Sequence, residues 1–264
     1  MSSLKRTITN RTITMKTSNK LVIAGIILVL ISLVGYDFLL KGAYVSGKYK
    51  DPYNAFAGLN FKGFDTVDLV SSTAVNVKFV QGPFSVRIDS NFSAYTRLKQ
   101  TGKRLQINAV FESGYLSDPT AYTMVISCPH LSVINTDATY KSNGKQVTDT
   151  IVRDDWRMRK VLIDGFKQDS LIINQDYGST VVLANSHLQS VSTVTGRSGK
   201  SGSKLVILED NQIQNANLDI LNNSTLILGN ARIGYLNYRL ADSAKLILTG
   251  KAQNLLKNSK SEQK

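Results

Sequence analysis

VVLANSHLQSV, residues 181–191, recurs in variant form three times further along the chain, as LVILEDNQIQNA (205–216), LILGNARIGYL (226–236) and LILTGKAQNL (246–255). Each segment starts with an apolar-x-apolar triplet, crosses three to five polar residues, and then carries small or apolar residues separated by two others. The segments start 24, 21 and 20 residues apart. A period near twenty, with Asn, Gly and Ser between the apolar triplets, is typical of chains that stack one repeat on the next.

Stacking is required because a single repeat cannot bury its own apolar face. At a strand spacing of about 4.8 Å, stacked repeats would align one residue of each into an interior row: Val181, Leu205, Leu226 and Leu246. Asparagines are expected at the tight bends, since Asn tolerates left-handed backbone: Asn185, Asn211 and Asn230. A leucine-rich repeat has a similar period but needs denser leucines and a helical side. We therefore predict an all-β fold, a parallel β-helix (solenoid).

The earlier part of the chain carries related signals. MVISCPHLSVI, residues 124–134, fits the same template, with its corner at residues 127–130. Apolar and polar residues alternate over 75–79, 84–88 and 105–109, which predicts half-buried strands. Gly82-Pro83 and residues 101–103 are predicted turns between them. Residues 140–170 are more charged and less regular than the repeats around them.

A long apolar stretch near the N-terminus predicts one transmembrane helix. Residues 21–40 contain a single charged residue, Asp37, and about 17–25 apolar residues suffice to span a bilayer. Five basic residues and no acid precede it, so the positive-inside rule places the N-terminus in the cytoplasm. We predict a cytoplasmic basic tail (1–20), a transmembrane signal anchor (21–40), a linker (41–62), a β-helix ectodomain (63–256) in the periplasm or outside the cell, and a disordered tail (257–264).

A cleaved signal peptide is the alternative for this stretch. Its apolar region would be about 7–15 residues long and would precede a small-x-small site. The nearest candidate, Gly42-Ala43, follows bulky residues and fits poorly. The only cysteine in the chain is Cys128, which excludes an internal disulfide, a multi-cysteine zinc site and a lipid-bearing cysteine after the apolar stretch.

The formal net charge of +13 restricts the class of partner. Part of the excess lies in the first twenty residues, and the remainder is spread along the chain. A spread positive charge suits contact with anionic polymers or membrane surfaces. No basic helix or aromatic ribonucleoprotein pattern is present, so we predict no nucleic-acid partner.

Several segments together resemble the auto-transporter adhesin, head GIN domain family. The resemblance rests on Phe64–Val67, Val77–Gly82, Leu105–Ile107 and Pro129–Ile134 and covers roughly residues 60–250. It departs from the family at Asp137-Ala138, where a small residue such as Gly usually follows the corner. The resemblance implies a right-handed parallel β-helix on the outer side of a bacterial membrane, and it brings no catalytic residues.

Three segments carry residue types that could support chemistry. Cys128 and His130 flank Pro129. A reactive thiol would need a base held in the right orientation, which the neighbouring sequence does not supply. A metal site would need more ligands than these two residues. GRSGKSGSK (196–204) resembles a phosphate loop, but Val194 replaces the first glycine and a strand follows instead of a helix. Acid, base and a sugar-stacking aromatic occur together in one short patch: Asp154, Asp155, Trp156 and Arg157.

These observations favour a non-catalytic protein. We predict no catalytic residue, no cofactor and no metal. Contact with a glycan or another envelope surface is expected at the acidic patch and at two basic residues of the 196–204 loop: Asp154, Asp155, Trp156, Arg157, Arg197 and Lys200. The predicted function is an adhesin-like binding or structural module of the cell envelope, with a polysaccharide or protein partner. A polysaccharide lyase or hydrolase on the same scaffold and a signalling component acting through the cytoplasmic tail remain as alternatives.

Overall fold

The computed structural model describes residues 16–47, 50–113, 122–151, 160–257 and 260–262. Its contacts divide the chain into two units, residues 1–54 and 55–264. The first contains helix α1 (Thr17–Val45), whose most apolar window has a mean hydropathy of 2.4 and no buried residue. This helix is long and apolar enough to cross a membrane. It contains the predicted span 21–40 and extends it at both ends.

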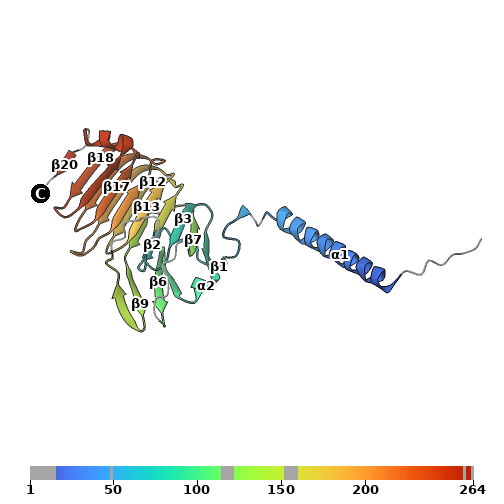
Figure 1. Cartoon of the computed structure of the whole chain (residues 1–264). Helices are drawn as coiled ribbons and strands as arrows, with labels where there is room; N and C mark the ends of the chain where they lie inside the picture. Colours follow the sequence, from blue (N-terminus) through green and yellow to red (C-terminus); the bar gives the residue numbers. More distant parts are fainter. Residues whose placement is uncertain (1–15, 48–49, 114–121, 152–159, 258–259, 263–264) are drawn as a thin grey trace, which may run out of the picture. The chain divides into compact units, whose positions relative to one another are not determined.

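The second unit is mostly β, with two large sheets of mainly parallel strands (Figure 1). In spatial order, the described residues give sheet A the strands β1 (Ala57–Leu59), β4 (Ser85–Ile88), β7 (Met124–Cys128), β3 (Val77–Gln81), β11 (Val161–Asp164), β13 (Thr180–Ala184), β15 (Lys204–Ile207), β17 (Thr225–Gly229) and β19 (Lys245–Thr249).

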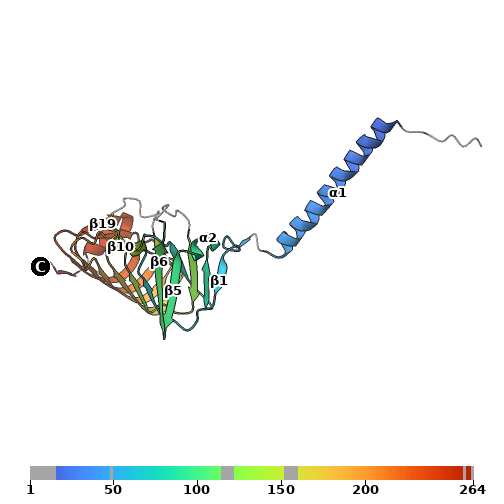
Figure 2. The ribbon, with the colours of Figure 1, turned by 90° about the horizontal axis from the view of Figure 1, so that it is seen from below.

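Sheet B runs through β10 (Lys145–Thr148), β9 (Thr139–Ser142), β6 (Arg104–Phe111), β2 (Thr66–Leu69), β8 (Val133–Thr136), β12 (Lys167–Gln175), β14 (His187–Thr195), β16 (Gln212–Ile220), β18 (Arg232–Leu240) and β20 (Lys260–Glu262), again for the described residues, with β5 (Thr96–Thr101) paired to β6. Figure 2 shows β5 and β6 next to one another, as their pairing requires. The described part of this unit also contains the short helices α2 (Ser90–Ser93) and η2 (Gly250–Lys257).

The predicted interior row is confirmed residue for residue. Val181 pairs with Leu205, Leu205 with Leu226, and Leu226 with Leu246, all in parallel register. From β11 onward each repeat contributes one strand to sheet A and the next to sheet B. The apolar residues between the sheets form one continuous core, because every repeat turns the same face inward.

Two of the three predicted asparagine bends are confirmed. Asn185 and Asn230 have φ of 49° and 60°. The prediction for Asn211 is wrong, since Asn211 is absent from the residues with positive φ. Its side chain is fully buried and donates hydrogen bonds to the carbonyls of Leu183 and Leu208. Asn211 therefore stabilises this corner through the hydrogen bonds of its side-chain amide and not through a left-handed backbone conformation.

The first half of the chain departs from sequential stacking. The strand pairs β1–β4, β4–β7, β5–β6 and β9–β10 are antiparallel. In sheet A, β3 lies between β7 and β11, so Met124 pairs with Val77 and not with a residue of the following repeat. The 124–134 segment does bury its apolar residues as the template predicts. Its first strand, β7, pairs only with the earlier strands β3 and β4, whereas β8 pairs with the earlier β2 and the later β12. Residues 260–262 form β20, inside the segment predicted to be a disordered tail.

Candidate binding face

The outward side of sheet B carries polar side chains in aligned rows. The strands β12, β14, β16 and β18 are nine residues long and share one register. Their inward residues are mostly buried, so the residues between them face outward. One row is Ile172, Ser192, Asn217 and Asn237, and the next is Asn174, Val194, Asp219 and Arg239. We call this outward side the polar face.

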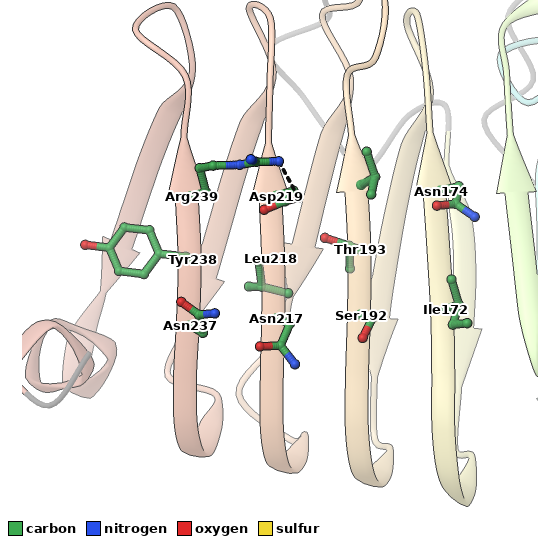
Figure 3. A pocket seen from close by; sticks show the side chains of 11 residues that line it. Ile172, Asn174, Ser192, Thr193, Asn217, Leu218, Asp219, Asn237, Tyr238 and Arg239 are labelled. Carbon is green, nitrogen blue, oxygen red and sulfur yellow. Dashed lines mark hydrogen bonds and ion pairs between the residues drawn. The ribbon is translucent and has the colours of Figure 1, made fainter. Parts of the chain in front are cut away.

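A shallow hollow of about 290 Å³ lies over these rows (Figure 3). Asp219 accepts a hydrogen bond from Arg239 at 2.6 Å, which neutralises both charges at one side of the hollow. The side chains of Asn217 and Asn237 are adjacent in the register and form no hydrogen bond with any other described residue. We call this the amide hollow, because these two amides are available to a ligand as donors and acceptors.

A second hollow of about 300 Å³ adjoins the first at Asn174. A line of hydrogen bonds crosses it from strand to strand. Asn135 donates to Asp68 at 2.7 Å, Asn174 donates to Asn135 at 2.8 Å, and Arg197 donates to Asn174 at 3.1 Å. Arg104 closes the far end with two bonds to Asp68, at 2.7 and 2.8 Å. We call this the ladder hollow; its amides are held in fixed orientations before any ligand arrives.

Two acids of the ladder hollow have opposite pKa shifts. Burial raises the pKa of Asp137, and the nearby charge of Asp176 adds to the rise. Burial also raises the pKa of Asp176, but hydrogen bonds from Ser198 and the Tyr177 N–H outweigh it and leave the pKa lowered. Asp137 accepts from the Ala138 N–H and Asp176 from the Tyr177 N–H, each in the turn after its own strand, and Asp176 also accepts from the Ser198 N–H in the loop after β14. These acids therefore hold the corners of the fold.

A third hollow, of about 350 Å³, adjoins the ladder hollow at Val70. Its cationic and amide side chains come from β5, β6 and the β9–β10 hairpin: Arg97, Asn108, Lys141 and Gln146. Strand register places them on the same side of sheet B as the other two hollows. We call it the basic hollow. The three hollows together form one shallow track that crosses the strands of sheet B.

Only part of the predicted contact surface can be located. Asp154, Asp155, Trp156 and Arg157 lie outside the described residues. Arg197 lines the ladder hollow, and Lys200 is exposed in the same loop, residues 196–203. This loop is anchored by two buried serines, since Ser203 donates to the Tyr177 carbonyl and exchanges a hydrogen bond with Ser201. A strand follows the loop, as predicted.

The sequence analysis missed most of the polar face. Asp68, Asn135 and Asn174 are separated by 67 and 39 residues along the chain, and no local motif connects them. A signal was present in the repeats, because Asn174, Asn217 and Asn237 occupy the outward-facing positions between inward-facing residues.

Within the described ranges there is no group of three or more His, Cys, Asp or Glu residues that could hold a metal.

Cys128 has the environment of a structural residue. Its thiol is fully buried, and burial raises its pKa to about 12, although a backbone hydrogen bond at His130 opposes the rise. His130 is exposed. A thiol held protonated at neutral pH is a poor nucleophile, because the thiolate is the reactive form. The structure therefore gives no support to a thiol–imidazole site.

We predict that Cys128 resists iodoacetamide in the native protein at pH 7.5 and reacts fully in urea. The unfolded thiol, with a pKa near 9.0, ionises well before the native one near 12. The unfolded state then holds fewer protons, so the free energy of unfolding should fall as pH rises from about 9 to 12. Cys128→Ala should abolish this part of the alkaline loss. Rapid labelling of the native protein at pH 7.5 would contradict the assignment.

Comparisons with known proteins agree with this fold. No family model matches the sequence, and no curated protein matches it. A solved structure described as a "putative adhesin" from Parabacteroides distasonis aligns with a TM-score of 0.51 at 11% identity, over 73% of this chain and 71% of that chain. The chain therefore shares the fold of a protein described in those words.

Two further structures align less closely. A "putative lipid binding protein" from Parabacteroides distasonis gives a TM-score of 0.36 at 12% identity, over 74% of this chain and 94% of that chain. A "putative adhesin" from Bacteroides fragilis gives 0.34 at 12% identity, over 79% and 94%. The specific resemblance to the GIN domain family stays a prediction.

Proposed function

We propose that the protein is a membrane-anchored binding module of the bacterial cell envelope, and that its polar face binds an extended glycan. In this proposal the two sheets are the sides of a right-handed parallel β-helix of the GIN domain type. Support comes from the regular alternation of repeats between the sheets and from the fold shared with a protein described as a "putative adhesin". The protein acts by surface contact and not by catalysis.

The observation that carries the proposal is the repetition of hydrogen-bonding side chains along the track. Successive strands lie about 4.8 Å apart, so equivalent side chains recur at that interval across the sheet. Amides both donate and accept, which suits the hydroxyl and amide groups of a sugar chain. The line from Asp68 through Asn135 and Asn174 is already ordered. Little side-chain entropy is then lost on binding, and many weak contacts add up along one polymer.

The proposed orientation follows from the charges beside the apolar helix. The residues before α1 contain Lys5, Arg6, Arg11 and Lys16 and no acid, so the positive-inside rule favours a cytoplasmic N-terminus. The β unit then lies in the periplasm or outside the cell, where envelope polysaccharide is available. A cleaved signal sequence would place the same unit in the same compartment.

The test removes the two available amides of the amide hollow. The full chain, purified in detergent, should be retained on immobilised peptidoglycan, lipopolysaccharide or a capsular polysaccharide. Asn217→Ala with Asn237→Ala should weaken that retention about tenfold, since each lost hydrogen bond is worth about 0.5–1.5 kcal/mol. The matched control removes two exposed amides outside the face, by Asn91→Ala with Gln253→Ala. Equal retention of both double variants would contradict the proposal.

A carbohydrate-active enzyme is the alternative, and one observation favours it. Asp137 and Asp176 lie at equivalent positions after adjacent strands, with pKa values shifted in opposite directions. Such a pair is what general acid and base catalysis requires. The bound polysaccharides are therefore assayed for released sugars as well. Release by the wild type that stops in Asp176→Asn would replace the binding module with an enzyme.

A further inference from the structure

The basic hollow differs from the other two hollows in its charge. Its lining contains two cations, Arg97 and Lys141, with the amides of Asn108 and Gln146 and no carboxylate. In the ladder hollow Arg104 is paired with Asp68, and in the amide hollow Arg239 is paired with Asp219. Neither Arg97 nor Lys141 forms an ion pair with any acid of the described ranges. Both are exposed at the surface of β5 and β9.

Strand register holds these groups on one surface. Arg97 of β5 is directly opposite Asn108 of β6, and Lys141 of β9 is opposite Val110 of β6 and Gln146 of β10. Directly opposed residues project to the same side of a sheet. Lys99, opposite Gln106, adds a third positive charge on that side.

The position of the Arg97 guanidinium is defined by its neighbours. Arg97 donates from Nη1 to the carbonyls of Ala94 at 2.6 Å and Thr96 at 3.3 Å. These bonds fix the guanidinium while leaving its other N–H groups for a ligand, because Arg carries five donors. Below the hollow, the hydroxyl of Ser71 donates to the Thr139 carbonyl at 2.7 Å and accepts from the Ala109 N–H at 2.8 Å, which joins β6 to β9.

Aromatic packing stiffens the same junction. The rings of Tyr95 and Phe111 stack with centroids 5.5 Å apart, and Phe111 meets Tyr140 edge to face at 5.8 Å. These contacts link the residue before β5 to β6 and β9 near the end of sheet B. The hollow is therefore a formed feature of the fold, lined by one cation held in place, a second exposed cation and two amides.

We propose that the basic hollow is a subsite for an anionic group, a carboxylate or sulfate, of the same polymer that the polar face binds. The inference rests on the proposed function and names its ligand class: an acidic polysaccharide that crosses the strands, with one acidic group against Arg97 and Lys141. Guanidinium and ammonium groups form their strongest hydrogen bonds with such anions. A polymer is favoured over an anionic lipid surface because the hollow continues, through Val70 and Asn174, into hollows lined by amides.

The test compares two polymers that share a backbone and differ in charge, polygalacturonate and its methyl ester. The full chain in phosphatidylcholine nanodiscs should bind polygalacturonate more tightly, and added salt should weaken only that binding. Arg97→Gln with Lys141→Gln should weaken polygalacturonate binding roughly threefold to tenfold, as expected for two exposed charge contacts, and leave ester binding unchanged. The matched control removes two exposed lysines of β19 and η2, by Lys245→Gln with Lys251→Gln, and should bind both polymers like the wild type.

Each result separates the subsite from the proposed function. If the wild type binds both polymers equally, or if Arg97→Gln with Lys141→Gln keeps the preference for polygalacturonate, the subsite is wrong and the polar face stands. If neither polymer binds, the subsite is wrong, and the polar face is decided by retention on peptidoglycan, lipopolysaccharide or capsular polysaccharide. A flotation assay with phosphatidylglycerol vesicles completes the design. Loss of vesicle binding in the double variant with unchanged polygalacturonate binding would overturn the polymer subsite in favour of a lipid headgroup site.

Discussion

Leu131→Asp is expected to leave the β unit without a cooperative unfolding transition. Leu131 is fully buried at the turn from β7 to β8, within the continuous core. Its backbone is held on both sides by Gln168, whose amide accepts from the Leu131 N–H at 3.1 Å and donates to the Leu131 carbonyl at 2.6 Å. The side chain of residue 131 is thus directed into the core and cannot turn outward without breaking both bonds.

The expected loss exceeds what a domain of this kind can tolerate. Removing a buried leucine side chain costs about 2–5 kcal/mol, and placing an unpaired carboxylate in the core costs several more. Typical domains have only about 5–15 kcal/mol of stability in total. The measurement is thermal unfolding of the full chain in detergent, followed by near-ultraviolet circular dichroism, together with limited proteolysis.

Two control variants keep this prediction specific. Leu131→Met conserves volume and should cost less than about 1.5 kcal/mol. Ile247→Asp introduces the same charge at an apolar residue that is 43% exposed on β19, and should leave a cooperative transition. A Leu131→Asp protein that unfolds cooperatively near the wild-type temperature would show that residue 131 is not in the core.

Asn211→Ala should give the second largest effect, a fall of about 2–4 kcal/mol in the free energy of unfolding. The Asn211 amide donates to the carbonyls of Leu183 at 2.7 Å and Leu208 at 2.8 Å and accepts from the Ser186 N–H at 3.1 Å. Alanine leaves the Ser186 N–H buried without this acceptor. Each buried hydrogen bond contributes about 1 kcal/mol, and an unsatisfied buried group costs about 1–3 kcal/mol.

The measurement is urea unfolding, with Asn215→Ala as the matched control. Asn215 is exposed and makes a single long hydrogen bond, at 3.4 Å, to the Gln189 carbonyl. Its replacement should change the free energy of unfolding by no more than about 0.5 kcal/mol. If the two alanine variants were equally stable, the buried amide would not be a structural link between neighbouring repeats.

The candidate site illustrates how far sequence reasoning reached. Arg197 was named from its basic loop, and the structure places it at the ladder hollow, although its role in binding stays a prediction. The residues that form the ladder could not be identified in this way. Asp68, Asn135 and Asn174 occupy unremarkable positions in three separate strands, and their contact depends on which strands become neighbours.

The sequence by itself determined the repeat, the interior row and the apolar helix near the N-terminus. These features are local, because side-chain alternation has a period of two and each repeat must bury the same face against the next. The tertiary structure alone decided the strand order, in which β3 separates β7 from β11 and β8 separates β2 from β12. It also decided that the Asn211 side chain forms buried hydrogen bonds to neighbouring backbone groups and that Arg97 and Lys141 line one hollow. Those outcomes depend on pairings between distant segments, and the energy of a long-range pairing is not carried by either segment alone.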